Sequence, residues 1–229
     1  MAVNLDESTI IRYIIGDFES CWDALAALPG PLPRGNFLFA RQAMTLLEVA
    51  CRLCKADPTG NALQDFSNEL SKKDQRYFTV FPHNCWKPSK RTAAAFDLPH
   101  LGTSPKQELI AAMFNLIRNG QAHQYQQMRA DMNDQSSFQF ALTGAEHGLY
   151  LASVLFRGRP ADHLLFNKQA SRDLWVTVRT DVLFLDIRNS LYGAHLLDRG
   201  LKLQFINERF EFSSAAAEKA LVDAGFNQQ

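Results

Sequence analysis

The sequence predicts an α+β fold that is predominantly α-helical, and three observations support this class. Apolar residues recur every three or four positions through most of the first 135 residues, as in amphipathic helices. Further along, the pattern changes to the alternation typical of strands. With 229 residues, of which 46% are hydrophobic, the chain can bury a sizeable core. We expect a helical bundle over residues 1–135 and an α/β extension over residues 136–229, either packed on the bundle or continuous with it.

Three helices are predicted before residue 71. Their ranges are Leu5–Leu28, Phe37–Lys55 and about Ala62–Leu70. The first is ended by the loop Pro29–Pro33, because its prolines lack backbone donors and disfavour helix in the residue before them. Asn36 is a suitable cap for the second helix. Beyond them, Tyr77–Pro82 is consistent with a short strand or an apolar turn.

The longest predicted helix is Ser104–Asp134, and the candidate site is built on it. Ser104, Pro105 and Gln107 supply an N-cap, a favourable first position and a capping-box partner. Apolar residues then follow at helical spacing, namely Leu109, Ile110, Met113, Phe114, Ile117, Tyr125 and Met128.

The second half is expected to mix strands with two further helices. Strands are predicted at Ser137–Leu142, Leu164–Phe166, Leu174–Val178 and Leu201–Ile206. A helix capped by Thr180 or Asp181 is predicted to run to Leu197, with Gly200 as its stop. A last short helix is predicted after Ser213.

The middle of the long helix carries Arg118, Asn119 and His123 in the string IRNGQAH. This string resembles the HEPN family (higher eukaryotes and prokaryotes nucleotide-binding), whose members carry Arg, four to six residues and then His near the end of a helical bundle. Asn119 directly after the Arg, and the small Ala122 before the His, strengthen the resemblance. It covers about the first 135 residues and implies a HEPN-like bundle.

The resemblance also implies metal-independent RNA cleavage, without a cofactor, by a ribonuclease of the toxin or defence type. His123 would exchange protons with a ribose 2′-hydroxyl or the leaving oxygen. Arg118 would hold the scissile phosphate, and Asn119 would position His123 or the phosphate. On a regular helix Arg118 and His123 project about 140° apart, so a facing helix from a homodimer would complete the site.

Two alternative interpretations stay open. In the first, Arg118 and His123 only link helices by hydrogen bonds. The protein would then be a non-catalytic HEPN-like module that binds a nucleotide or a protein, such as an antitoxin. In the other, the apolar second half would enclose a small molecule.

Two further groups of residues are weaker candidates. Arg188, Asn189 and His195 repeat the Arg-Asn…His pattern, and seven positions along one helix would place Arg188 and His195 on the same face. The basic segment Trp86, Lys87, Lys90 and Arg91 would stack a base and hold phosphate, or would form a solvated loop anchored by its Trp. Cys51 and Cys54 have zinc-like spacing, but they lie in an apolar helix, which favours buried thiols and no metal site.

The charge balance of the chain indicates which partners are expected. The chain has 24 basic and 24 acidic residues, so its formal net charge is zero. This balance argues against a dedicated high-affinity nucleic-acid binder, but it is compatible with RNA or a nucleotide bound at a local basic cleft. No leader pattern and no apolar run of about 20 residues is found, so we expect a cytoplasmic protein that does not enter the membrane.

Overall fold

The structure, a computed structural model, is mainly helical with one small sheet. It describes residues 7–27, 36–55, 60–80, 108–119, 130–131, 137–144, 159–168, 173–196, 199, 219 and 222–223. The helices are α1 (Glu7–Ala26), α2 (Asn36–Lys55), α3 (Asn61–Lys73), α5 (Leu109–Met113) and α8 (Thr180–Gly193). They are joined by a 3₁₀ turn, η1 (Gln75–Phe78), and a π-helical turn, η2 (Phe114–Asn119). The strands are β1 (Ala130–Asp131), β2 (Ser137–Thr143), β3 (Leu165–Lys168) and β4 (Leu174–Arg179).

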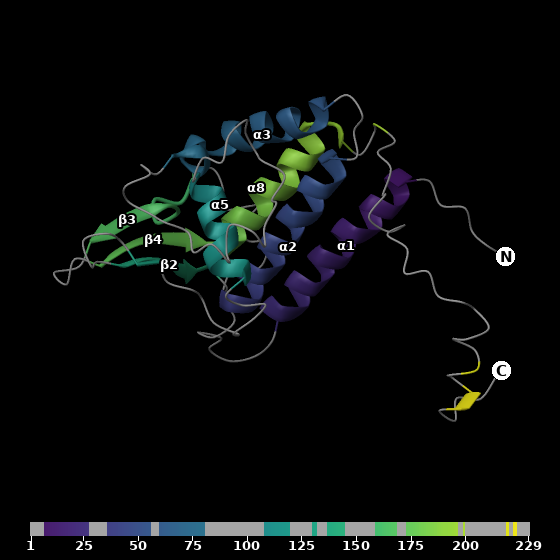
Figure 1. Ribbon diagram of the computed structural model, residues 1–229, viewed down its shortest axis with the longest axis horizontal. Coiled ribbons are helices and arrows are strands. Elements are labelled where there is room, and N and C mark those ends of the chain that lie inside the picture. Colours follow the sequence, from purple (N-terminus) through teal and green to yellow (C-terminus); the bar gives the residue numbers. More distant parts are fainter. Residues whose placement is uncertain are drawn as a thin grey trace.

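The helices form a layer in which α8 packs against both α2 and α3, while α1 packs on α2 (Figure 1). Trp22 of α1 ties three of these helices together. Its ring centroid lies 4.5 Å from that of Phe39 in α2 and 4.8 Å from that of Phe184 in α8. All three rings are fully buried, so this aromatic cluster is the centre of the helical layer.

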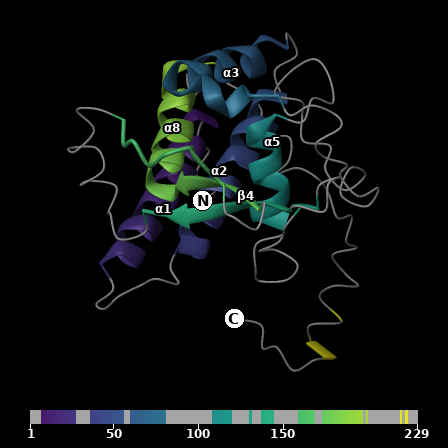
Figure 2. The same ribbon diagram turned by 90° about the vertical axis from the view of Figure 1, so that its left-hand side faces the viewer.

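The sheet lies at one end of the helical layer, with strand order β1-β2-β4-β3 (Figures 1 and 2). The central strands β2 and β4 are parallel, with Phe138 opposite Leu174, and both outer strands pair antiparallel to them. Alternate residues of the central strands, including Phe140, Val176 and Val178, face the core. One continuous buried cluster therefore includes residues from both sides of the domain boundary expected after residue 135.

Most local predictions agree with this architecture. The α+β class with predominant helix is confirmed, and so are the predicted helices that became α1, α2 and α3 and the strands that became β2, β3 and β4, to within a few residues. Tyr77–Pro82 was expected to be a strand or an apolar turn; Tyr77 and Phe78 lie in η1, and Val80 forms an isolated bridge with Glu108. The strand predicted at Leu201–Ile206 lies outside the described residues.

The predicted helix Ser104–Asp134 is wrong at both ends. Glu108 is extended, with φ −70° and ψ 150°, and the helix α5 begins only after it. The pairing of Glu108 with Val80, together with the bond from the Leu109 N–H to the Thr79 carbonyl (2.9 Å), fixes this start. At the other end, Ala130–Asp131 forms β1 on the edge of β2. Tertiary pairing has thus overridden the local capping signal.

The predicted helix from Thr180 to Leu197 is shorter than expected. Its N-cap is Arg179, because the Thr180 hydroxyl donates to the Thr143 carbonyl at the end of β2 (3.0 Å) and does not cap the helix. Its last residue is Gly193, since His195 adopts a left-handed backbone with φ 53°. No helix in the described part of the chain combines the length and apolar character needed to cross a membrane.

Two glycine substitutions of opposite expected sign test the junction between β2 and α8. Gly144 has φ +88°, and a Cβ there would lie 2.3 Å from Asp181 Oδ1, whereas a Cβ at Gly16 in α1 meets nothing within 4 Å. We expect Gly144→Ala to lower the free energy of unfolding by about 1–3 kcal/mol. Gly16→Ala should raise it by about 0.5–1 kcal/mol. Urea denaturation measures both; a neutral Gly144→Ala would contradict the described junction.

Candidate functional site

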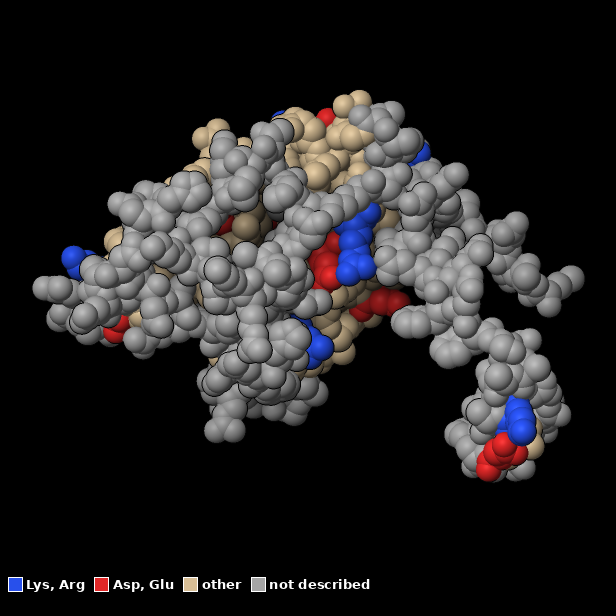
Figure 3. Space-filling model, viewed as in Figure 1, with Lys and Arg blue, Asp and Glu red and all other residues tan. Residues whose placement is uncertain are grey.

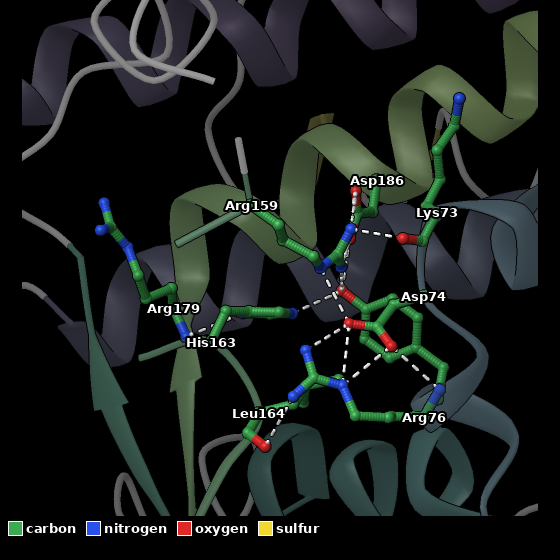
Figure 4. A network of polar contacts seen from close by, with 9 residues as sticks. Lys73, Asp74, Arg76, Arg159, His163, Leu164, Arg179 and Asp186 are labelled. Atoms are coloured by element: carbon green, nitrogen blue, oxygen red, sulfur yellow. Dashed lines mark hydrogen bonds and ion pairs between the residues drawn. The ribbon is translucent and has the colours of Figure 1, made fainter. Parts of the chain in front are cut away.

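A buried network of polar side chains joins three segments that are far apart in the sequence (Figure 4). Asp74 and Tyr77 come from the end of α3 and from η1, Arg159 and His163 from the turn before β3, and Asp186 from α8. Charged and polar groups are rarely buried unless each finds a partner. This network is therefore the first place to look for chemistry in the described part of the chain.

The Tyr77 hydroxyl is the centre of the network. It donates to Asp186 Oδ2 (2.7 Å) and lies 2.9 Å from His163 Nε2. On the other side of the imidazole ring, Nδ1 accepts the backbone N–H of Arg179 (3.3 Å). Nδ1 is thus an acceptor, which places the proton of the neutral ring on Nε2 and makes it a donor to Tyr77.

Two arginines, Arg76 and Arg159, neutralise the charges of the Asp74 and Asp186 carboxylates. Arg159 contacts Asp74 Oδ2 through Nε (2.8 Å), forms an ion pair with Asp186, and donates to the Lys73 carbonyl (2.6 Å). Arg76 forks onto Asp74 with bonds of 3.0 Å and 2.7 Å from Nε and Nη2. The guanidinium groups are thus held by protein oxygens, which leaves little donor capacity for an external anion.

The environment shifts the pKa values of these groups in different directions. Burial, together with the positive charge of Arg159, lowers the pKa of His163 to about 3. Burial raises the pKa of Asp186 more than its bonds with Tyr77 and Arg159 lower it. For Asp74 burial also acts upward, but the hydrogen bonds from Arg76 and the charge of Arg159 outweigh it and lower the pKa. Burial, with the charge of Asp186, raises the pKa of Tyr77 well above its usual value.

This network links three separate segments of the chain and is unsuited to proton transfer. His163 is fully buried, and both of its ring nitrogens are already used inside the protein. A general base needs a nitrogen within reach of the substrate proton. Arg76 also donates to the carbonyl of Leu164 (3.3 Å), a residue with the unfavourable φ of 56°. The network therefore fixes the turn that leads into β3.

A second polar cluster lies where the parallel strands β2 and β4 end. Arg179 donates to both oxygens of Asp181, at 3.2 Å and 2.7 Å, and its Nη1 is 3.6 Å from Asp162 Oδ1. Asp181 is fully buried beside Gly144. The carboxyl ends of parallel strands are a common ligand site. Here the space is filled by the chain's own ion pair, which anchors the first turn of α8.

The first predicted motif is described only in part. Arg118 and Asn119 are the last two residues of η2, and their side chains, like all of His123, lie outside the described residues. Within the same turn Phe114, Leu116 and Ile117 are buried, and η2 packs on α2. The angle of about 140° between Arg118 and His123 stays a prediction, because η2 ends at Asn119 and the chain from there to His123 lies outside the described residues.

The second predicted motif is described, and its arginine is engaged. Arg188 forms an ion pair with Glu19 of α1 and donates to Asn189 Oδ1 (3.1 Å). Its guanidinium carbon also lies 5.2 Å from the centroid of the exposed Tyr192 ring. The expectation that Arg188 and His195 share a helix face is wrong, because α8 ends at Gly193 before it reaches His195.

The remaining candidates divide between buried and undescribed residues. Cys51 and Cys54 are buried in α2, as predicted. No group of three or more His, Cys, Asp or Glu side chains suitable for a metal occurs among the residues that the structure places. The basic segment with Trp86, Lys87, Lys90 and Arg91 lies outside the described ranges.

Sequence reasoning missed the network around Tyr77. One signal was available: Asp186 interrupts the apolar run from Val182 to Ile187, and a carboxylate in such a run needs a buried partner. The identity of that partner was not readable, because Tyr77 is 109 residues away. His163 stands 86 residues from Tyr77 and belongs to no short motif.

Comparison with known proteins adds no assignment. Neither the protein-family models, nor the curated proteins, nor the solved structures that were searched give a match to this chain.

The buried state of His163 makes stability depend on pH. Its pKa of about 3 in the folded protein is below the value of about 6.5 expected when unfolded, so the unfolded chain binds the proton more readily. The stabilisation is complete above pH 6.5 and is lost as the pH falls towards 3. From pH 7 to pH 5 this single group should remove about 2 kcal/mol from the free energy of unfolding.

The matched variants are His163→Gln and His195→Asn. Denaturation at pH 7, 6 and 5 should show the pH dependence reduced by about 2 kcal/mol in the first variant only. His195 is exposed, and Asn tolerates its left-handed backbone, so the second variant should behave as the wild type. Equal pH dependence in all three proteins would refute the neutral, buried His163.

Proposed function

We propose that the chain is a metal-independent endoribonuclease of the HEPN type, with Arg118, Asn119 and His123 as its catalytic residues. The observation that carries the proposal is the position of the Arg-Asn pair at the end of η2. Phe114, Leu116 and Ile117 hold this turn in the core, so the pair follows an anchored segment. Short π-helical turns occur frequently at functional sites.

The chemistry requires one proton acceptor and one cationic group. An imidazole such as that of His123 ordinarily titrates near pH 6.5 and can accept the proton of a ribose 2′-hydroxyl. The 2′-oxygen then attacks the adjacent phosphorus and the bond from phosphorus to the 5′-oxygen breaks. The leaving 5′-oxygen takes a proton from the protonated His123 or from water, and a 2′,3′-cyclic phosphate remains. Arg118 would neutralise the charge that develops on the phosphate oxygens, and Asn119 would orient the reacting groups.

Two observations on the described residues favour the Arg118 motif over His163 and over the Arg188 motif. The imidazole of His163 is buried with both nitrogens occupied, so it is unavailable to RNA. The guanidinium of Arg188 is held by Glu19 and Asn189, and its histidine lies beyond the helix. Neither arrangement offers an Arg and a His that converge on one phosphate.

The charges of the described surface restrict where RNA would bind. On the face shown in Figure 3, the blue basic groups of the described residues lie beside red acidic ones and form no broad basic field. We therefore place phosphate binding on Arg118 and on the basic segment around Trp86. Because these cations are few, the binding affinity should fall only moderately with added salt.

A second candidate function is a non-catalytic module that binds a protein partner, such as an antitoxin. The exposed apolar residues of β3 favour it, since Leu165 and Phe166 are 46% and 59% accessible. Side chains of this kind at the edge of a sheet are typical of interaction surfaces. A protein with this role would show no cleavage above background.

RNA cleavage by the full-length protein separates the two candidates. With single-stranded RNA in EDTA, the wild type should yield 2′,3′-cyclic phosphate ends. His123→Ala and Arg118→Ala should each reduce the rate at least 100-fold, the scale of a lost general base or phosphate clamp. The matched controls Arg188→Ala and His195→Ala should retain activity within about threefold if the second motif is structural. Wild-type activity in His123→Ala would exclude the proposed mechanism.

A further inference from the structure

Among the described strands, β3 is at one edge of the sheet. In the order β1-β2-β4-β3 it pairs with β4, and no other described strand lies beside it. An edge strand presents unpaired backbone N–H and carbonyl groups, which are ready to pair with another strand. Of the devices that protect natural edges, β3 has a short length and a terminal lysine, Lys168, but it has no proline, and its apolar Leu165 and Phe166 stay exposed.

Strand β3 carries one exposed apolar side chain on each face of the sheet. Phe166 is opposite Val176, whose side chain faces the core, so Phe166 lies on the helix side of the sheet. Leu165 is opposite Thr177 and lies on the other side. Both remain about half accessible, because β3 is at the edge. A partner strand along this edge would contact apolar surface above and below the sheet.

We propose that β3 is a homodimer interface, at which it pairs antiparallel with β3 of a second copy to form one continuous sheet. Antiparallel pairing of two identical strands requires a twofold axis perpendicular to the sheet. Residues opposite each other across the axis then point to the same face. A register centred on Phe166 satisfies this requirement and puts the two Phe166 rings side by side.

Charge complementarity supports a second copy as the occupant. In this register Lys168, at the exposed end of β3, lies beside the turn that carries Asp162 of the partner subunit. The Asp162 side chain is 52% exposed, and its ion pair with Arg179 is long, at 3.6 Å. The twofold axis creates the Lys168–Asp162 contact twice, so one arrangement pairs both the apolar and the charged groups of the edge.

This inference goes beyond the proposed ribonuclease and does not depend on it. The strand has four residues, so the area buried is small, and we expect a dissociation constant on the order of 10 μM. The second copy proposed here meets the chain at β3, the edge opposite to β1.

Sedimentation velocity on the full-length chain, from 1 to 100 μM (about tenfold below and above the expected constant), tests the interface. The wild type should convert from monomer to dimer over this range. Phe166→Lys places two like charges at the twofold axis and should raise the dissociation constant at least tenfold. The matched control is Tyr13→Lys on α1, a residue of similar exposure (61%), which should leave it within about twofold. A wild type that stays monomeric, or a Phe166→Lys variant that dimerises as the control does, would overturn the proposal.

Two further variants guard against loss of folding in Phe166→Lys. Lys168→Glu opposes like charges to Asp162 of the partner subunit and should also weaken the dimer, with the loss reduced in high salt. Phe166→Cys should form an interchain disulfide on mild oxidation, whereas Tyr13→Cys should not. No enrichment of the Phe166→Cys cross-link over Tyr13→Cys would count against the register. Mass is the readout throughout, so absence of RNA cleavage leaves these results interpretable.

Discussion

The buried hydroxyl of Tyr77 is the contact on which the arrangement of sheet and helices depends. It joins His163 of the turn before β3 to Asp186 of α8, while Arg159 bridges Asp186 to Asp74 at the end of α3. Burying such charges is costly unless every partner is present. Because the three segments supply one another's partners, removing any of them leaves an unpaired polar group in the core. Their positions are therefore fixed together.

Helix α8 connects the polar network to the sheet and to the other helices. Its first turn is anchored by the pair of Arg179 with Asp181 where β2 and β4 end, its middle meets Trp22 through Phe184, and Arg188 reaches α1. These contacts join α8 to the sheet at one end and to α1 at two points, so the sheet and the helical layer share one core. The boundary expected after residue 135 stays a prediction, and the packing of α8 on α2 and α3 crosses it.

Local sequence patterns predicted those elements whose boundaries are set locally. Periodicity found α1, α2 and α3, and alternation found β2, β3 and β4, because one face of each is buried. The pattern failed at Glu108, where pairing with Val80 competes with a strong capping signal, and at the end of α8. The polar network was out of reach for the same reason, since its partners are 86 and 109 residues apart. For the candidate site, the motif gave the residue types but not their geometry.

The strand order also bears on how a ribonuclease site and a dimer would coexist. The turn η2, which ends at Asn119, contacts α2 and β2, and the chain re-enters the sheet as β1. The motif-bearing segment therefore begins after a turn that contacts β2 and ends at β1, which are the two strands farthest from β3. With strands about 4.8 Å apart, β1 is roughly 14 Å from β3 and roughly 34 Å from β1 of a copy joined through β3. A dimer formed at β3 would therefore hold the two motifs apart, whereas a composite site needs them close together. Under both proposals the Arg118 motif must act within one chain or through a second contact between chains, and the oligomer present during RNA cleavage distinguishes these two arrangements.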